Sequence, residues 1–120
     1  MTVKECYETM GADYDGVVSR LRTDERVRKF LLKVLNDKSY ELLCTSLKER
    51  NMDEAFRAAH TLKGVCQNLS LDRLYMSSNE MAERLRGGRE YGDDIEPMLE
   101  RVEEDYMLTI SCIQQLAQEM

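Results

Sequence analysis

Residues 53–69 read DEAFRAAHTLKGVCQNL and carry the clearest structural pattern of the chain. In an α-helix with about 100° per residue, the small and medium apolar side chains of this stretch gather within about 60° of Leu62. These side chains are Ala55, Ala58, Ala59, Cys66 and Leu69. A single apolar stripe of this width is typical of a helix that packs against other helices. The stretch therefore predicts an amphipathic helix with Asp53 as its N-cap.

Apolar residues also recur at helical spacing before this stretch. They predict helices over residues 2–10, 13–21, 24–36 and 39–50. Gly11, Asn36 and Asn51 are the expected stops of the first, third and fourth of these helices. The N-terminal part of the chain is therefore expected to be helical, with very short turns.

Two further helices are predicted after residue 69. Ser70 or Asp72 begins the first, and Gly87 and Gly88 close it. The second begins near Asp93, because Asp93 and Glu96 resemble a capping box and Pro97 suits a first turn. This last helix can run almost to Met120, and its apolar face is expected to comprise Leu99, Val102, Tyr106, Ile110, Ile113 and Ala117.

Four long amphipathic helices with short connections predict an all-α fold, an antiparallel four-helix bundle of up-down-up-down topology. We expect the bundle over residues 37–120, with short additional N-terminal helices over residues 1–36 packed on it. The chain of 120 residues has the length of a single domain. Because such bundles serve many functions, the function has to come from particular residues.

The composition excludes several classes of function. The formal net charge of −6 disfavours nucleic acid and anionic membranes as partners. The single histidine, His60, cannot supply a di-metal bundle site, and the four cysteines include no C-x-x-C pair. We therefore expect no metal site and no cofactor on this chain.

The start of the chain, MTVKECYETMG, has no basic segment followed by an apolar core, so we expect no export signal. No run approaches the roughly 18 apolar residues of a membrane span. We expect a cytoplasmic protein and a monomer, since nothing in the sequence requires a dimer. In a reducing cytoplasm the cysteines act as small buried apolar residues; they are Cys6, Cys44, Cys66 and Cys112.

His60 falls about 160° from Leu62 on the predicted helix and should therefore face water. A solvated histidine without function is the common interpretation of such a residue. Its neighbours on the outer face make a functional interpretation stronger. They are Phe56, Lys63, Gly64 and Gln67, with Arg57 on the flank.

Each neighbour allows two interpretations. Gly64 costs roughly 1 kcal/mol of helix stability relative to alanine, and it either packs against another helix or gives access to His60. Phe56 either packs against a neighbouring helix or docks a partner. Arg57 and Lys63 straddle His60, and residues 55–71 contain no acidic residue. They form either a solvated basic face or a local positive field.

The functional interpretation points to phosphorus chemistry. A neutral imidazole nitrogen is a competent nucleophile toward phosphorus near neutral pH. Phosphoryl transfer spreads negative charge over three oxygens and requires in-line access. A lysine, a bare glycine and the absence of a nearby carboxylate suit both requirements.

The segment AFRAAHTLKGVCQNLS, residues 55–70, resembles the signature of histidine-containing phosphotransfer (HPt) domains. The family pattern has alanine before the histidine, then H-x-[LI]-K-G, then glycine ten residues after the histidine and a later leucine. The matching residues are Ala59, His60, Leu62, Lys63, Gly64 and Leu74. The chain departs from the pattern at Ser70, where glycine is usual, which leaves the geometry of that turn open. The chain looks like a stand-alone, bacterial-type, single-domain member.

The resemblance implies that His60 accepts a phosphoryl group, that Lys63 holds the phosphoryl oxygens and that Gly64 gives a partner access. Gln67 would be a polar neighbour of the imidazole, with Arg57 and Phe56 on the docking surface. The implied partners are a response-regulator receiver domain, which would bring its own Mg²⁺, and a hybrid histidine kinase.

The chain would then be a phosphocarrier and a substrate, not an enzyme. The alternative is a helical-bundle adaptor that binds a receiver or kinase domain through the same surface without being phosphorylated. An autonomous kinase is disfavoured because Gly87 and Gly88 are not part of a glycine-rich phosphate loop.

Overall fold

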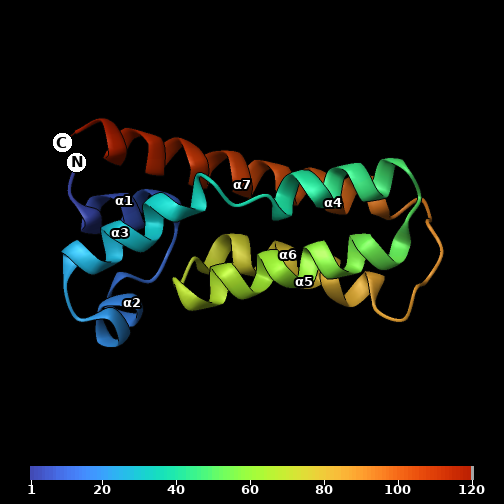
Figure 1. Ribbon diagram of the computed structural model, residues 1–120, viewed down its shortest axis with the longest axis horizontal. Helices are drawn as coiled ribbons and strands as arrows, with labels where there is room; N and C mark the ends of the chain where they lie inside the picture. Colours follow the sequence, from blue (N-terminus) through green and yellow to red (C-terminus); the bar gives the residue numbers. More distant parts are fainter. Residues whose placement is uncertain (120) are drawn as a thin grey trace.

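The computed structural model describes residues 1–119, and within that range the chain forms seven α-helices and no strand (Figure 1). The all-α prediction is confirmed. The helices are α1 (Val3–Met10), α2 (Tyr14–Leu21), α3 (Asp24–Val34), α4 (Ser39–Lys48), α5 (Met52–Asn68), α6 (Asp72–Leu85) and α7 (Ile95–Gln118).

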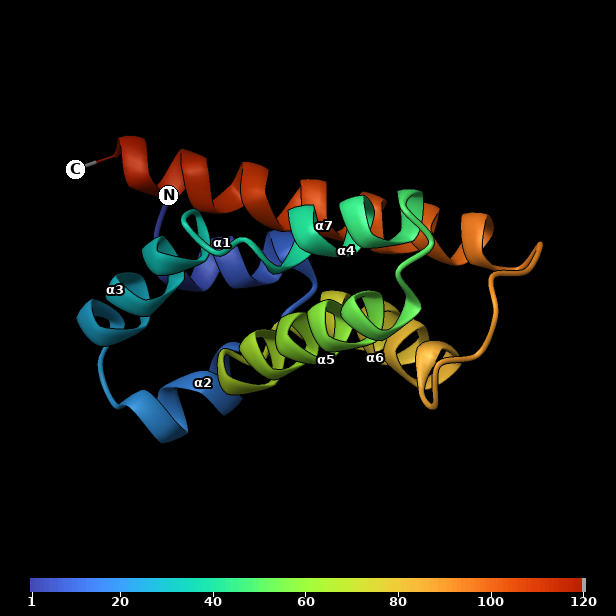
Figure 2. The ribbon, with the colours of Figure 1, turned by 45° about the vertical axis from the view of Figure 1, so that its right-hand side comes forward.

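Helices α4 to α7 form a helical bundle in which each helix packs against the next one in the chain. Figures 1 and 2 show that successive helices of this group run in opposite directions. The stacked rings of Tyr40 and Tyr106, 4.0 Å apart, join α4 to α7. Helices α1, α2 and α3 gather at the end of the molecule where α7 ends (Figure 1), and α1 and α3 pack on α7.

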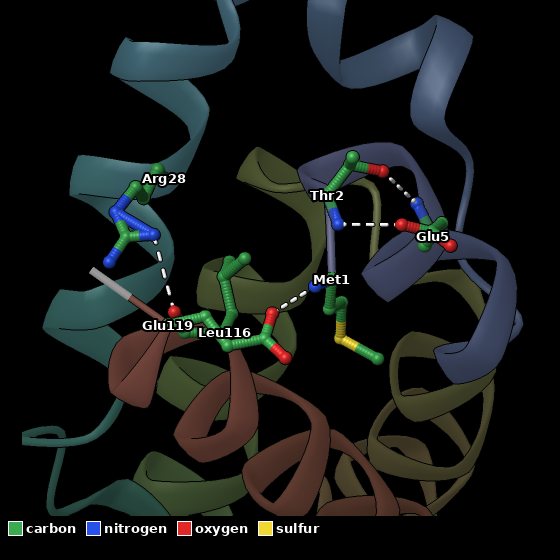
Figure 3. A network of polar contacts seen from close by, with 6 residues as sticks. All are labelled: Met1, Thr2, Glu5, Arg28, Leu116 and Glu119. Atoms are coloured by element: carbon green, nitrogen blue, oxygen red, sulfur yellow. Dashed lines mark hydrogen bonds and ion pairs between the residues drawn. The ribbon is translucent and has the colours of Figure 1, made fainter.

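Polar contacts tie the first helices to the end of α7, as Figure 3 shows. Thr2 caps α1, since its side chain accepts from the backbone of Glu5 and the Glu5 side chain accepts from the backbone of Thr2. The backbone nitrogen of Met1 contacts the Glu119 carboxylate. Arg28 of α3 donates to the Leu116 carbonyl at 3.3 Å. The N-terminus of α1 and helix α3 are thus held to the end of α7 that lies away from the α6–α7 loop.

Two predicted helix starts are wrong. Asn51, predicted as the stop of α4, is the N-cap of α5, and its side chain accepts from the Glu54 backbone nitrogen at 3.2 Å. Asp53 therefore lies inside the first turn. Arg50 provides the stop of α4, with a left-handed φ of 60°. Because the chain has already turned at Arg50, Asn51 is free to cap the next helix.

The predicted capping box before α7 does not form either. The helix begins at Ile95 after Asp94, and no side chain caps it. The Asp94 carboxylate instead forms an ion pair with Arg84 of α6, with an Nη2–Oδ1 distance of 3.0 Å. Pro97 does lie in the first turn.

The apolar stripe of α5 is buried as predicted: Ala55, Ala58, Ala59, Leu62, Cys66 and Leu69 are at most 6% exposed. The predicted face of α7 is only partly correct. Val102 and Ile113 are buried, whereas the flanking predicted residues are partly exposed; these are Leu99, Tyr106, Ile110 and Ala117. In their place the core takes Ile95, Thr109, Cys112 and Leu116. Helix α7 packs on α6 along one part and on α1 and α3 along another, so its buried stripe follows more than one neighbour.

The cysteines are free thiols. Three of them, Cys6, Cys66 and Cys112, are buried, and Cys44 is half-buried. Burial raises the pKa of the Cys6 and Cys66 thiols to about 12, so both remain protonated at neutral pH. Their role as small apolar residues is confirmed for the three buried cysteines. None of the helices in residues 1–119 combines the length and apolar character needed to span a bilayer.

Contacts from α1 and α2 fix the turn between α5 and α6. The Tyr7 hydroxyl donates to the Leu69 carbonyl at 2.8 Å. Arg20 donates to the carbonyls of Gln67 and Asn68, both at 3.0 Å, and to the Ser70 hydroxyl. Ser70 has a left-handed φ of 54°, the conformation that glycine adopts at the lowest cost. Ser70 therefore adopts the left-handed backbone conformation that a glycine would adopt at this turn, and its hydroxyl accepts a hydrogen bond from Arg20.

Candidate functional site

His60 lies on the outer face of α5 and is exposed, as the helical phase predicts. Ala59 beside it and Leu62 two residues later point into the core and are at most 2% exposed. The buried stripe therefore fixes the rotation of α5 and turns His60 away from the bundle. Among residues 1–119 no hydrogen bond engages the His60 ring, which leaves its nitrogens open to a reacting group.

Gly64 lies one helical turn after His60, and the space above it is open. A Cβ atom added at Gly64 would meet nothing within 4 Å. Tight packing against another helix, one of the two interpretations of this glycine, is therefore wrong. The bare backbone leaves room for another molecule to approach the imidazole.

Phe56 lies one turn before His60 and is half-buried against the core. Its ring and the imidazole are stacked, with centroids 5.8 Å apart and an interplanar angle of 28°. The Arg86 guanidinium carbon lies 5.3 Å from the centroid of the same ring. Phe56 thus packs on the bundle, which is one of its two interpretations, and it also supports one side of the imidazole. Its docking role remains a prediction.

Two charged residues of α6 and its C-cap, Glu83 and Arg86, reach the site, and the sequence analysis missed both. Arg86 pairs with Glu83 at 2.8 Å. This hydrogen bond lowers the pKa of the Glu83 carboxyl, and the charges of Lys63 and His60 lower it further. A carboxylate therefore lies near the site, which corrects the expectation of none. The sequence did contain a signal for these residues. The two helices predicted on either side of residue 70 run antiparallel, so residues close to 60 on one helix lie opposite residues close to 80 on the other.

The cations around His60 are not equivalent. Arg57 is exposed and forms an ion pair with Glu54, which lies just outside the acid-free stretch. Lys63 is half-buried, and no ion pair of Lys63 is present in the part of the chain that the structure describes. The local positive field of Arg57 and Lys63 is therefore weaker than the sequence predicts, because only Lys63 has no carboxylate partner in residues 1–119.

Gln67 is exposed two helical turns beyond His60, about 10 Å along the helix axis. Its carbonyl accepts a hydrogen bond from Arg20 at 3.0 Å. The structure thus places Gln67 on the same side of α5 as His60 and Gly64, at the end of the helix that α2 holds.

The site has no feature of a metal centre in the described part of the chain. No group of three or more His, Cys, Asp or Glu side chains that could hold a metal ion occurs in residues 1–119. The site consists of the accessible nucleophile His60, the ring of Phe56 stacked beside it and a cation, Lys63. The bare backbone of Gly64 leaves room for another molecule to approach. Such a site can accept a group that another molecule brings and activates.

The model of the Hpt domain family matches residues 35–120, which contain α4 to α7 and every candidate site residue. The chain belongs to the Hpt domain family. Hpt domains are helical bundles that take part in phosphotransfer in two-component signalling. They are phosphocarriers rather than catalysts, and they typically interact with receiver domains and kinases. The Hpt match begins at the end of α3, so α1, α2 and α3 lie outside it.

No curated protein and no solved structure matches the chain.

Proposed function

We propose that this Hpt domain is a phosphocarrier that accepts a phosphoryl group on His60 and exchanges it with the aspartate of response-regulator receiver domains. The observation that carries the proposal is the open face of α5, where the exposed His60 is followed one turn later by Gly64, at which an added Cβ atom would meet nothing within 4 Å. This face lies inside the residues that match the family.

The transfer is a displacement at phosphorus. A lone pair of one His60 ring nitrogen forms the P–N bond, while the P–O bond to the aspartate breaks and its electron pair remains on the carboxylate. The ring keeps the proton on its other nitrogen, so no separate base has to remove one in this step. The reverse displacement returns the phosphoryl group to an aspartate, and the Mg²⁺ that assists either direction is bound by the receiver domain.

Each neighbour has a role in this proposal. Lys63 stabilises the charge on the phosphoryl oxygens, and Gly64 leaves room for the receiver's aspartate to approach. Phe56 supports the imidazole, while Arg57 and Gln67 contribute to the docking surface. The scaffold is an antiparallel up-down-up-down four-helix bundle of residues 37–120, and residues 1–36 pack on it to complete one domain. We place the protein in the cytoplasm as a monomer, with a receiver domain or a hybrid histidine kinase as its partner.

The test uses a panel of purified receiver domains charged with a radiolabelled small-molecule phosphodonor. Mixing with wild-type protein should move label to this chain in a form that is labile in acid and stable in alkali, as phosphohistidine is. His60→Gln should accept no label. If no receiver transfers label, or if His60→Gln accepts it, the carrier proposal is wrong. Tight receiver binding without transfer would instead support the non-phosphorylated adaptor.

A further inference from the structure

The α6–α7 loop, residues 86–94, lies at the same end of the molecule as the turn between α4 and α5 (Figures 1 and 2). Its first residue, Arg86, belongs to the candidate site. The Arg86 side chain pairs with the Glu83 carboxylate at 2.8 Å and lies over the ring of Phe56, 5.3 Å from its centroid. Whatever fixes this loop therefore also fixes a cation at the site.

The backbone next to Arg86 is held only weakly by α6. The Arg86 N–H donates to the Glu83 carbonyl at 3.4 Å, which is long for a hydrogen bond between backbone groups. Gly87 and Gly88 follow with left-handed φ values of 81° and 69°. Two successive glycines give the chain little stiffness of its own. Contacts further along the loop are therefore needed to keep Arg86 in place.

Tyr91 supplies such a contact near the middle of the loop. The Arg50 guanidinium carbon lies 3.5 Å from the centroid of the Tyr91 ring, a close cation–π contact. Arg50 is itself fixed, because it ends α4 with a left-handed φ of 60° and donates to the Leu47 carbonyl at 2.7 Å. The half-buried Tyr91 ring also packs against the core. Tyr91 thus attaches the loop to the turn between α4 and α5.

The rest of the loop is attached to its own helix. Arg84 of α6 donates to the Glu90 carbonyl at 2.9 Å and to the Asp94 carboxylate at 3.0 Å. Its side chain is only 15% exposed. Arg84 therefore closes the loop between α6 and α7, whereas Tyr91 connects the loop to a different pair of helices.

Loss of the Tyr91 contact would act on the charges at the site. With the loop released, the Arg86 side chain can leave both the Phe56 ring and Glu83. The Glu83 carboxylate is close enough to Lys63 and His60 for their charges to lower its pKa. A Glu83 carboxylate without Arg86 would therefore pair with Lys63 and remove the cation that the phosphoryl group needs.

We propose that Tyr91 is a positioning residue for phosphotransfer. By holding the α6–α7 loop on Arg50, it keeps Arg86 on Glu83, so that Lys63 stays available for the phosphoryl oxygens. Tyr91 acts through Arg86 and not on the reacting atoms. This inference rests on the proposed function.

The test measures single-turnover transfer from the receiver domain that phosphorylates the wild-type protein fastest in the panel above. Tyr91→Ala should slow transfer by about two- to threefold, within the range of exposed ion pairs, because Arg86 is still present but no longer held. Tyr91→Phe should transfer at the wild-type rate, since it keeps an aromatic ring for Arg50.

A second substitution separates positioning from a general loss of packing. In the double variant Tyr91→Ala/Glu83→Gln no carboxylate competes for Lys63, so transfer should return to nearly the wild-type rate. Tyr106→Ala is the matched control, because Tyr106 is also half-buried and stacks on one other side chain, Tyr40, between α4 and α7. It should leave transfer unchanged at a temperature where circular dichroism shows every variant folded.

The possible failures are distinguishable. If wild type accepts label and Tyr91→Ala accepts it equally fast, the loop does not position Arg86, and the carrier function stands. If Tyr91→Ala is slow and Glu83→Gln does not restore it, or if Tyr106→Ala is equally slow, the effect does not pass through the Glu83 charge and the inference is wrong. If no receiver transfers label to wild type, the proposed function fails and this inference fails with it.

Discussion

Gly64 weakens α5 and has no packing reason to be a glycine. Because a Cβ atom would meet nothing within 4 Å, Gly64→Ala should raise the free energy of unfolding by about 0.5–1 kcal/mol through helix propensity alone. Gly64→Gln should remain folded and slow transfer to a receiver by about tenfold, because its side chain fills the approach to His60. Urea denaturation and the transfer assay measure the two effects. Wild-type transfer by Gly64→Gln would contradict the access role.

Arg86, at the C-cap of α6, forms an ion pair with the Glu83 carboxylate, which lies near His60 of α5. In Arg86→Ala the Glu83 carboxylate loses its partner and becomes available to Lys63, the cation that otherwise pairs with no carboxylate in residues 1–119. We expect phosphotransfer to fall by about fivefold, within the range of exposed ion pairs. The double variant Arg86→Ala/Glu83→Gln removes the competing charge and should restore most of the rate. A double variant as slow as Arg86→Ala would show that Arg86 acts in another way.

At the scale of the helices, α2 stabilises the end of α5 through Arg20. This side chain donates to two carbonyls of the last turn of α5 and to Ser70. Arg20→Ala should lower the free energy of unfolding by about 1–3 kcal/mol, because hydrogen bonds from a charged group to the C-terminus of a helix are lost. Arg26→Ala, on an exposed residue of α3, is the matched control and should change stability by less than about 0.5 kcal/mol. Equal effects in urea denaturation would contradict the capping role of Arg20.

How well the sequence predicts the buried face of a helix depends on how many other helices pack against it. The stripe of α5 could be read from the sequence because its apolar residues face one core, and this also fixed the outward position of His60. The face of α7 could not, since that helix serves the bundle and the N-terminal helices at once. Asn51 and Asp53 are both good N-cap residues, and the choice depends on where the preceding turn ends, at Arg50.

The site shows the same limit. The helical phase of α5 correctly predicted which of its own side chains lie on the outer face around His60. Glu83 and Arg86 were missed, because they come from α6 and its C-cap and the helical phase of α5 alone says nothing about them. Finding them required the antiparallel pairing of α5 and α6 to be considered as well. Arg20 escaped prediction for the same reason, since its contact with the end of α5 joins residues about 50 positions apart.

At the scale of the whole molecule, three buried thiols report on whether the N-terminal helices and the bundle unfold together. Cys6 lies in α1, Cys66 in α5 and Cys112 in α7. Burial raises the pKa of the Cys6 and Cys66 thiols to about 12 and also raises that of Cys112. At neutral pH these thiols are therefore buried in the unreactive protonated form, and they should react with a thiol reagent only after unfolding.

If residues 1–120 form one domain, all three thiols should become reactive at the same urea concentration, at the midpoint seen by circular dichroism. Mass spectrometry of the labelled peptides distinguishes them. Labelling of Cys6 at a clearly lower urea concentration than Cys66 would show that the N-terminal helices unfold separately. The half-buried Cys44 serves as an internal reference and should react first.

The outward position of His60 also affects how long a phosphoryl group can remain bound to it. No element of residues 1–119 folds over this side chain, so a phosphoryl group held there stays in contact with water. Spontaneous hydrolysis of the P–N bond then limits how long the signal persists. A receiver has to arrive within that interval, and the concentration of receiver in the cell decides whether the phosphoryl group is passed on or lost.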